Sequence, residues 1–384
     1  MKRIKRLLCA LLCVSIIFTT LCGCIDREKI LDLVIPEKTF QEADGFEALE
    51  ENEKKELVFS EMEKAFQNGE KSVEFNYDCS EYLFKAYREV CTENPQFFWL
   101  TRSSSYQIIE TVLNKKIVFK PKILLSDEEI KLMQSEIDAE TDKFLKGIRQ
   151  DTSDYKKVLY IHDYLVDNGT YDTESADVVT KNEKTDFPQN VHDSTTIYGC
   201  LVTRKVICSG YSAGFKYLAD KLGLESIRVG GKTLDTGESH QWNCVKVDGE
   251  YYYIDVTWDD KVDKDPSIRS RDYEFFLINE QELLLTHEIE EGQNLPECTK
   301  TDYNYFVYNG LYMERYSYFD FVNIVKGKMP TSYITVKFGS ADECEKASKD
   351  LFEGYQRFWY IPGVGQGDVM TSVSESGKIL TVEW

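Results

Sequence analysis

The stretch "SHQWNCVKVDGEYYYIDVTWDD", from Ser239 to Asp260, decides the fold class of the region around it. Asp248-Gly249 lies between two runs of β-branched and aromatic residues, a pattern typical of a two-residue hairpin loop. If these residues form the loop, Val247 lies opposite Glu250. One face of the hairpin is then apolar, which predicts that it is buried and that the register is well defined. The residues of this face are Val245, Val247, Tyr252, Ile254 and Val256.

The same register predicts that a histidine and an aspartate lie close together. Continued past the loop, it sets Trp242 opposite Asp255 and His240 opposite Thr257. His240 and Asp255 then become diagonal neighbours on one face, about 7 to 8 Å apart at the backbone, near enough for an imidazole nitrogen to reach a carboxylate. A slip of one residue would place them on opposite faces.

The stretch "RKVICSGYSAGFKYL", from Arg204 to Leu218, predicts a helix that begins at Cys208. Gly223 is placed to end this helix as a left-handed cap. Unpaired N–H groups and aligned dipoles at a helix N-terminus lower the pKa of a thiol, and they can also hold an oxyanion. A buried filler, half of a disulfide and a nucleophile all stay open for Cys208. The apolar face of the helix carries Tyr211, Phe215, Leu218 and Leu222.

A thiol, a base and an orienting carboxylate form the minimum apparatus for covalent acyl transfer. In that interpretation His240 takes the proton from Cys208 and later delivers it to the leaving amine, while Asp255 fixes the imidazole tautomer. The alternative is a capped helix beside a hairpin that carries an incidental histidine. His162 is a second candidate base, with Asp259 and Asp260 as its orienting acids, but it falls on the apolar face of a predicted helix. A satisfied core histidine is the preferred interpretation there.

Three motifs carry a resemblance to a known family: "YIHDYLVDNGTYD", "VICSGYSAGFKYLADKLGLES" and the hairpin stretch quoted first. Together they resemble the transglutaminase-like superfamily, in the form common in bacterial extracytoplasmic proteins, over about residues 126–290. The resemblance implies an α+β fold with a papain-like core, in which a helix with an N-terminal cysteine packs on an antiparallel sheet, flanked by smaller α+β domains. It also implies that Cys208 is the nucleophile, His240 the base and Asp255 the orienting acid.

The activity implied by this resemblance is the processing of amide bonds in extracellular protein or cell-wall peptide through a cysteine thioester. Cross-linking and hydrolysis both stay open, because the sequence does not specify the acceptor. One alternative is a catalytically idle binding or assembly lipoprotein that uses the fold as a scaffold. Another is a structural protein in which Cys208 is bonded to Cys200 or Cys244.

The sequence departs from the family pattern at several positions. Gln241 stands where alanine is frequent, and we expect its side chain to point to the core side. We match no residue to the upstream tryptophan that stabilises the transition state in animal transglutaminases. Tyr198 could supply an oxyanion donor, although a buried structural tyrosine is the preferred interpretation. An acidic run lacks the spacing of a calcium loop and predicts a solvated loop; its members are Asp259, Asp260, Asp263 and Asp265.

The domain organisation expected from the sequence begins with a leader over residues 1–23. Its apolar run is too short to span a bilayer, and Cys22-Gly23-Cys24 resembles the end of a bacterial lipobox. We therefore expect lipidation at Cys24 and a chain anchored by lipid to the extracytoplasmic face of the cell membrane, with secretion without lipid as the alternative. The remaining parts are a linker (24–44), an N-terminal α+β domain (45–125), a catalytic domain (126–291) and an accessory α+β domain (292–384).

Charge and cysteine content limit the partners. Removing the leader takes away four positive charges and no negative ones, so the formal net charge goes from −21 to −25. Nucleic acid is therefore not an expected partner, whereas a protein or peptide substrate is. Seven of the eleven cysteines follow the leader and Cys24, an odd number that leaves at least one thiol unpaired within the chain. No zinc-type cluster is present in the sequence, and we expect no metal and no cofactor.

Overall fold

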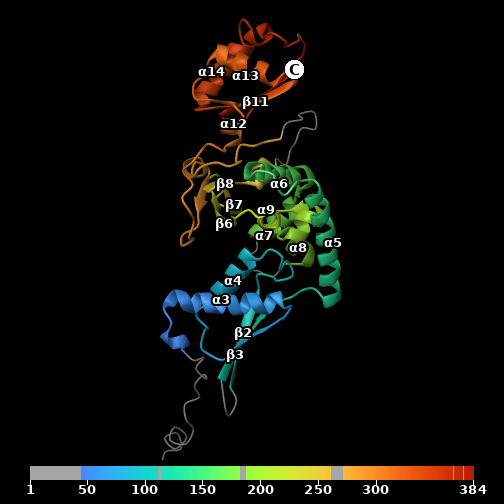
Figure 1. The fold of residues 1–384 in the computed structure, drawn as a ribbon, viewed down its shortest axis with the longest axis vertical. Helices are drawn as coiled ribbons and strands as arrows, with labels where there is room; N and C mark the ends of the chain where they lie inside the picture. The colour runs from blue at the N-terminus through green and yellow to red at the C-terminus, as the bar shows by residue number, and fades with distance from the viewer. Residues whose placement is uncertain (1–44, 111–114, 182–186, 261–270, 366, 375) are drawn as a thin grey trace, which may run out of the picture.

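The computed structural model describes residues 45–110, 115–181, 187–260, 271–365, 367–374 and 376–384. Figure 1 shows three groups of elements along the long axis of the molecule: an N-terminal unit at one end, a C-terminal unit at the other and a helix-and-sheet layer between them. All three mix helices and strands, so the expected α+β class is confirmed. The predicted leader, the linker and Cys24 lie outside the described residues.

The N-terminal unit packs two helices on a small antiparallel sheet. Its strand order is β1-β3-β2. A capping box between Glu50 and Glu53 starts the first long helix. The elements are η1 (Phe46–Ala48), α3 (Glu51–Gln67), β1 (Val73–Phe75), α4 (Leu83–Glu93), β2 (Ser104–Glu110) and β3 (Lys115–Pro121).

The middle layer begins with a helix whose start the sequence predicts, because "SDEE" has a serine at 126 followed three residues later by a glutamate, the pattern of a capping box. Ser126 Oγ accepts from the Glu129 backbone N–H and the Glu129 carboxylate accepts from that of Ser126, so the box is present as expected. Strand β4 follows α6 and strand β5 precedes α9. The two strands pair in parallel, which places the C-terminal end of α6 near the N-terminus of α9. The elements are α5 (Asp127–Lys146), α6 (Asp154–Asn168), β4 (Thr170–Tyr171), α7 (Thr173–Lys181), α8 (Gln189–Ser194), the π-helix η2 (Gly199–Thr203), β5 (Lys205–Val206) and α9 (Cys208–Lys221).

Helix α9 lies against an antiparallel sheet of order β8-β7-β6-β9. Two hydrogen bonds connect α9 to β7. Ser212 Oγ donates to Trp242 O over 3.1 Å, and Asn243 Nδ2 donates to Ser212 O over 3.1 Å. Gly223 has φ 72 and ends the α9 segment in the left-handed region, as predicted. The strands are β6 (Ser226–Thr233), β7 (Ser239–Val247), β8 (Glu250–Ile254) and β9 (His287–Ile289).

The hairpin of β7 and β8 has the predicted register. Val247 pairs with Glu250, and Asp248-Gly249 forms the loop with positive φ at both residues. The predicted continuation to Asp255 and Thr257 is wrong, because β8 ends at Ile254. Asp255 is instead the N-cap of a short helix, α10 (Val256–Asp259), and its carboxylate accepts two backbone N–H groups there.

The hydrophobic core runs through the N-terminal unit and the middle layer without a break. One cluster of buried side chains extends from Phe46 to Leu277. A second cluster, from Phe306 to Val382, lies in the C-terminal unit. A third, smaller one fills the outer face of the β6–β8 sheet and includes Trp242 and Cys298.

The C-terminal unit has a four-stranded sheet of order β10-β11-β13-β12. From the sequence, "SYITVKF" and "ILTVEW" are expected to be strands and 341–352 a helix, and all three are present. Asn309-Gly310 is a pattern typical of a hairpin turn, but that expectation is wrong. Asn309 is the C-cap of α12, Gly310 follows with φ 66, and β10 pairs in parallel with β11. The elements are α11 (Glu280–Leu283), α12 (Tyr305–Tyr308), β10 (Tyr312–Met313), α13 (Tyr318–Lys328), β11 (Tyr333–Phe338), α14 (Ala341–Phe352), η3 (Arg357–Tyr360), β12 (Met370–Val373) and β13 (Ile379–Glu383).

Within the described ranges, no helix combines the length and the apolar character needed to cross a bilayer.

Candidate active site

Cys208 is the first residue of α9, as the sequence predicted. Ile207 is the extended N-cap, and its carbonyl accepts from the N–H groups of Gly210 (2.9 Å) and Tyr211 (3.0 Å). The N–H groups of Cys208 and Ser209 come before these and have no acceptor within the helix. A side chain at Gly210 would bring its Cβ to 2.4 Å from Ser194 O, so glycine allows the first turn of α9 to lie against α8. The thiol of Cys208 is half-buried.

His240 and Asp255 meet although the predicted ladder does not reach them. His240 Nε2 lies 2.6 Å from Asp255 Oδ2, and both side chains are buried. The imidazole is stacked on Trp242, with ring centroids 5.9 Å apart. Nε2 faces the carboxylate, and His240 also shares a hydrogen bond with the thiol of Cys208. The structure therefore brings all three predicted site residues together.

The electrostatics of the three groups favour a thiolate. Burial raises the pKa of Cys208, but the hydrogen bond from His240 and its charge outweigh burial, so the pKa lies below that of an ordinary thiol. Burial lowers the pKa of His240, whereas Asp255 raises it by more, to about 10. Both shifts favour the pair of an imidazolium and a thiolate over the pair of neutral groups. By contrast, burial raises the pKa of Cys91 and of Cys200 to about 12.

Asp255 accepts four N–H groups. Oδ1 accepts from the backbone N–H of Thr257 at 2.9 Å and of Trp258 at 3.2 Å. Oδ2 accepts from His240 and, at 3.2 Å, from Nε2 of His287. These bonds keep the carboxylate charged. Burial raises the pKa of Asp255, but His240 and then His287 lower it by a larger amount, so the pKa lies well below the usual range.

His287 is the functional neighbour that sequence reasoning missed. It lies on the edge strand β9, it is buried, and its Nδ1 is 2.7 Å from Thr286 Oγ1. No local motif marks it, because its relation to Asp255 depends on β9 pairing with β6. In this arrangement His287 acts as a positioning residue for the Asp255 carboxylate.

The ligand atoms of His240, Asp255 and His287 lie within 4.8 Å of one another and form a group that could hold a metal ion. The sequence led us to expect no metal. Two ligands of one tetrahedral zinc ion, each about 2.1 Å from it, stand roughly 3.4 Å apart. His240 Nε2 and Asp255 Oδ2 are 2.6 Å apart, a separation that fits a charge-assisted hydrogen bond.

Tyr171 is a second neighbour that the sequence did not single out. It pairs with Val206 across the short β4–β5 ladder, two residues before Cys208. Burial and then the nearby Cys208 raise the pKa of its phenol, so the O–H stays protonated and can donate. Tyr198, the predicted candidate, donates instead to Glu136 Oε2 over 2.8 Å and has the structural role that was preferred for it.

Arg228 on β6 connects the start of α9 with β7. Its Nη2 donates to Ser209 O and to Gln241 Oε1, both over 3.0 Å, and its Nε donates to Ser212 Oγ over 3.2 Å. Gln241 therefore points to the face that packs on α9, the side predicted for it, where it holds the guanidinium.

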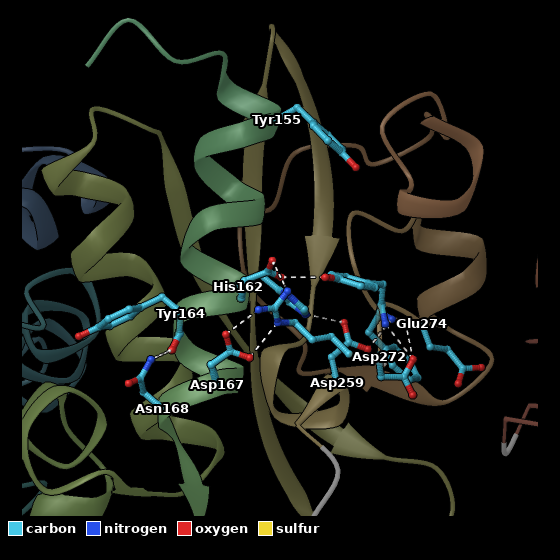
Figure 2. A network of polar contacts seen from close by, with 12 residues as sticks. Tyr155, His162, Tyr164, Asp167, Asn168, Asp259, Asp272 and Glu274 are labelled. Carbon is cyan, nitrogen blue, oxygen red and sulfur yellow. Dashed lines mark hydrogen bonds and ion pairs between the residues drawn. The ribbon is translucent and has the colours of Figure 1, made fainter. Parts of the chain in front are cut away.

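His162 belongs to a separate charge cluster, shown in Figure 2. Its two ring nitrogens lie 3.1 Å from Asp163 Oδ1 and 3.1 Å from Asp259 Oδ2, and the side chain is buried. Burial lowers its pKa, but the two carboxylates raise it by more, to about 9. His162 is thus the satisfied core histidine that the sequence predicted, while His240 is the imidazole that changes the pKa of Cys208.

The prediction of a solvated loop for the acidic run is wrong at its first two members. Asp259 and Asp260 are both buried. Asp259 faces His162 and accepts from Phe275 N over 3.0 Å, while Asp260 accepts from the phenol of Tyr211. Asp263 and Asp265 lie outside the described residues.

Replacing His162 with glutamine should destabilise the fold and leave the chemistry of Cys208 unchanged. We expect a loss of about 3 to 5 kcal/mol in the free energy of unfolding, because the change removes the cation from a buried pair. Urea denaturation measures the loss. Arg271→Gln, in the exposed part of the same cluster, should cost about 1 kcal/mol or less. A shift in the pH profile of Cys208 alkylation in His162→Gln would contradict this separation of roles.

The chain was compared with family models, with curated proteins and with solved structures. No family model matches the chain, and no curated protein matches it. The solved structures that match include a transglutaminase (TGase), at 20% identity over 41% of this chain and 44% of that one, with a TM-score of 0.29. A candidate cysteine protease from Cytophaga hutchinsonii matches at 13% identity over 40% of this chain and 62% of that one, with a TM-score of 0.24.

A candidate protease from Parabacteroides distasonis matches at 12% identity over 39% of this chain and 37% of that one, with a TM-score of 0.22. The chain thus spans less than two thirds of each of these structures. Their names agree with the expected resemblance to the transglutaminase-like superfamily. At these TM-scores the likeness carries no conclusion about the activity of this chain.

Proposed function

We propose that this chain is a transglutaminase-like thiol enzyme that processes amide bonds through a Cys208 thioester. The observation that carries the proposal is the half-buried thiol at the N-terminus of α9, whose pKa is lowered by an imidazole that Asp255 holds at 2.6 Å. In this proposal α9 on the β6–β8 sheet is the papain-like core that the resemblance implies. Cys208 is the nucleophile, His240 the acid and base, and Asp255 the group that orients His240.

The first half of the reaction forms the thioester. The Cys208 thiolate attacks the carbonyl carbon of an amide, a C–S bond forms, and the electron pair of the C=O bond moves to oxygen. We propose that the backbone N–H groups of Cys208 and Ser209 and the phenol of Tyr171 stabilise that oxyanion. The His240 imidazolium gives its proton to the amide nitrogen, the C–N bond breaks, and an amine or ammonia leaves.

The second half depends on the acceptor. Neutral His240 takes a proton from water or from an amine as that group attacks the thioester carbon. The C–S bond then breaks and returns the thiolate. Water gives hydrolysis and a lysine amine gives a cross-link, and the same site residues serve both outcomes.

We propose extracellular protein or cell-wall peptide as the substrate class, because the boundary between the expected leader (1–23) and Cys24 has the lipobox-like sequence Cys22-Gly23-Cys24. Lipidation at Cys24 would hold the enzyme on the extracytoplasmic face of the cell membrane. The acidity of the chain suits protein or peptide partners better than nucleic acid.

The proposal is tested by labelling the full chain with a glutamine-peptide electrophile at pH 6.5, followed by mass analysis of the modified peptide. We expect fast, single labelling at Cys208 and none in Cys208→Ala. Cys91, also half-buried but with a raised pKa, is the internal control and should react slowly. Slow reaction of both thiols would favour the idle scaffold, and an absent free thiol at Cys208 would favour a structural disulfide.

The oxyanion role of Tyr171 gives a separate prediction. Tyr171→Phe should lower kcat about 10²-fold or more while KM changes little, because one donor to the oxyanion is removed. Tyr198→Phe is the matched control, since that phenol is bonded to Glu136, and its kcat should be unchanged. Equal losses in the two variants would show that Tyr171 is structural.

A further inference from the structure

Two buried cysteines outside the proposed active site face each other. The Sγ atoms of Cys244 and Cys298 are 3.5 Å apart, and both residues are almost completely buried. Cys298 Sγ also donates to Pro296 O over 3.7 Å, so the structure describes a hydrogen-bonded pair of thiols. The proposed chemistry at Cys208 uses neither of them.

The pair joins segments that are distant in the sequence. Cys244 is on β7, the strand that carries His240, and pairs with Tyr253. Cys298 lies in the segment that leads from β9 to the C-terminal unit, and its carbonyl accepts from Glu280 N over 2.8 Å. Apolar side chains of the outer sheet face surround both, among them Trp242 and Tyr253.

We propose that Cys244 and Cys298 form a disulfide that fastens this segment to β7. A disulfide needs its sulfur atoms about 2.05 Å apart, which requires an approach of roughly 1.5 Å from the present contact. The other described cysteines are placed differently: Cys200, for example, packs so closely on α9 that a Cβ at Gly214 would lie 2.3 Å from its Sγ.

The bond forms by exchange with an oxidant of the disulfide class. The thiolate of one cysteine attacks a sulfur of the oxidant, the S–S bond of the oxidant breaks, and one thiol leaves. The second cysteine then loses its proton and attacks the mixed disulfide, which releases the second thiol. The protein gives up two electrons and two protons, and the oxidant takes them up as two thiols.

The structural consequence is a covalently closed loop whose ends, Cys244 and Cys298, are 54 positions apart in the sequence. A closed loop of this length restricts the unfolded chain more than the folded one. We expect the oxidised chain to unfold at a Tm roughly 10 °C higher than the reduced chain.

The test uses the full chain with Cys208→Ser, so that the reactive thiol cannot form mixed disulfides. The protein is refolded from urea in glutathione buffers of increasing oxidised fraction, trapped with N-ethylmaleimide in denaturant and mapped by mass spectrometry. We expect a linked peptide containing Cys244 and Cys298, at oxidant levels that leave Cys79, Cys200 and Cys344 alkylated. Reduction should return the Tm to that of the same chain refolded without oxidant.

Cys200→Ala is the control and should leave the linked peptide unchanged. Alkylation of both Cys244 and Cys298 in the most oxidising buffer, by a chain that has refolded to the native spectrum, overturns the proposal. A linkage of either cysteine to another partner overturns it too. Because the wild-type thiols themselves are measured, the result does not depend on whether an alanine variant folds.

Discussion

Replacing His240 with alanine should lower turnover at least 10⁴-fold and move the alkylation of Cys208 to higher pH. His240 is the group that brings the pKa of this thiol below that of an ordinary cysteine, against the effect of burial. Without the imidazole, burial and the charge of Asp255 are opposed only by weaker effects such as the Gln241 backbone N–H, so the pKa should rise. Reactivity at pH 7 should therefore fall, because a smaller fraction of the thiol is ionised. Loss of the acid and base for both half-reactions gives the effect on turnover.

The rate of iodoacetamide reaction at Cys208 between pH 5 and pH 10 measures this effect. In the unsubstituted chain the reactivity should be well developed below the ~8.5 of a free cysteine. His162→Gln is the matched control, because it removes another buried imidazole that is bonded to carboxylates. If His162→Gln shifts the profile and His240→Ala does not, the site has been assigned to the wrong histidine.

Asp255→Asn should reduce turnover by roughly 10⁴-fold and also weaken the fold. In serine proteases the corresponding change costs about this factor, since the amide favours the wrong imidazole tautomer. Here the carboxylate accepts four N–H groups, two at each oxygen. An amide has one oxygen, so its NH₂ group must face two of these donors. Leaving them unpaired in a buried site should cost about 2 to 4 kcal/mol in the free energy of unfolding.

The pH dependence of this loss has a defined sign. The pKa of Asp255 is lowered in the folded state, so the carboxylate stabilises the fold above the pKa of an unfolded aspartate, about 3.9. That contribution is lost as the pH falls below this value. Urea denaturation at pH 7 and at pH 3 should thus show a smaller difference between Asp255→Asn and the unsubstituted chain at the lower pH. A difference that grows toward pH 3 would contradict the assigned charge.

The parts of the site that depend on local pattern could be predicted from the sequence. Asp248-Gly249 determined the register of β7 and β8 because two-residue loops match the twist of a hairpin. Apolar spacing and Gly223 predicted α9, with Cys208 at its first position. The contact between His240 and Asp255 was predicted correctly from a ladder that in fact stops one residue short of Asp255. Either a diagonal strand pair or a helix cap at this point brings the carboxylate near the imidazole.

What the sequence did not predict depends on contacts between distant segments. His287 reaches Asp255 only because β9 joins the far edge of the sheet, and a three-residue strand has little periodicity to detect. Tyr171 reaches the site through a parallel ladder of two residues. The pattern at Asn309-Gly310 suits a hairpin loop and a helix end equally well, since both use a left-handed glycine. Tertiary packing decided between them.

The four bonds to Asp255 have a consequence for how this fold would change after a loss of activity. Asp255 caps α10 and holds His287, so mutations at this position destabilise the fold and are selected against whether or not the site is used. The fold does not require a cysteine at position 208, because a serine or alanine fits the first position of α9. In lineages that keep the scaffold and abandon the chemistry, the thiol should therefore drift first, His240 later and the aspartate last. A descendant with Asp255 alone would say nothing about catalysis, whereas one that keeps the thiol is still under selection for it.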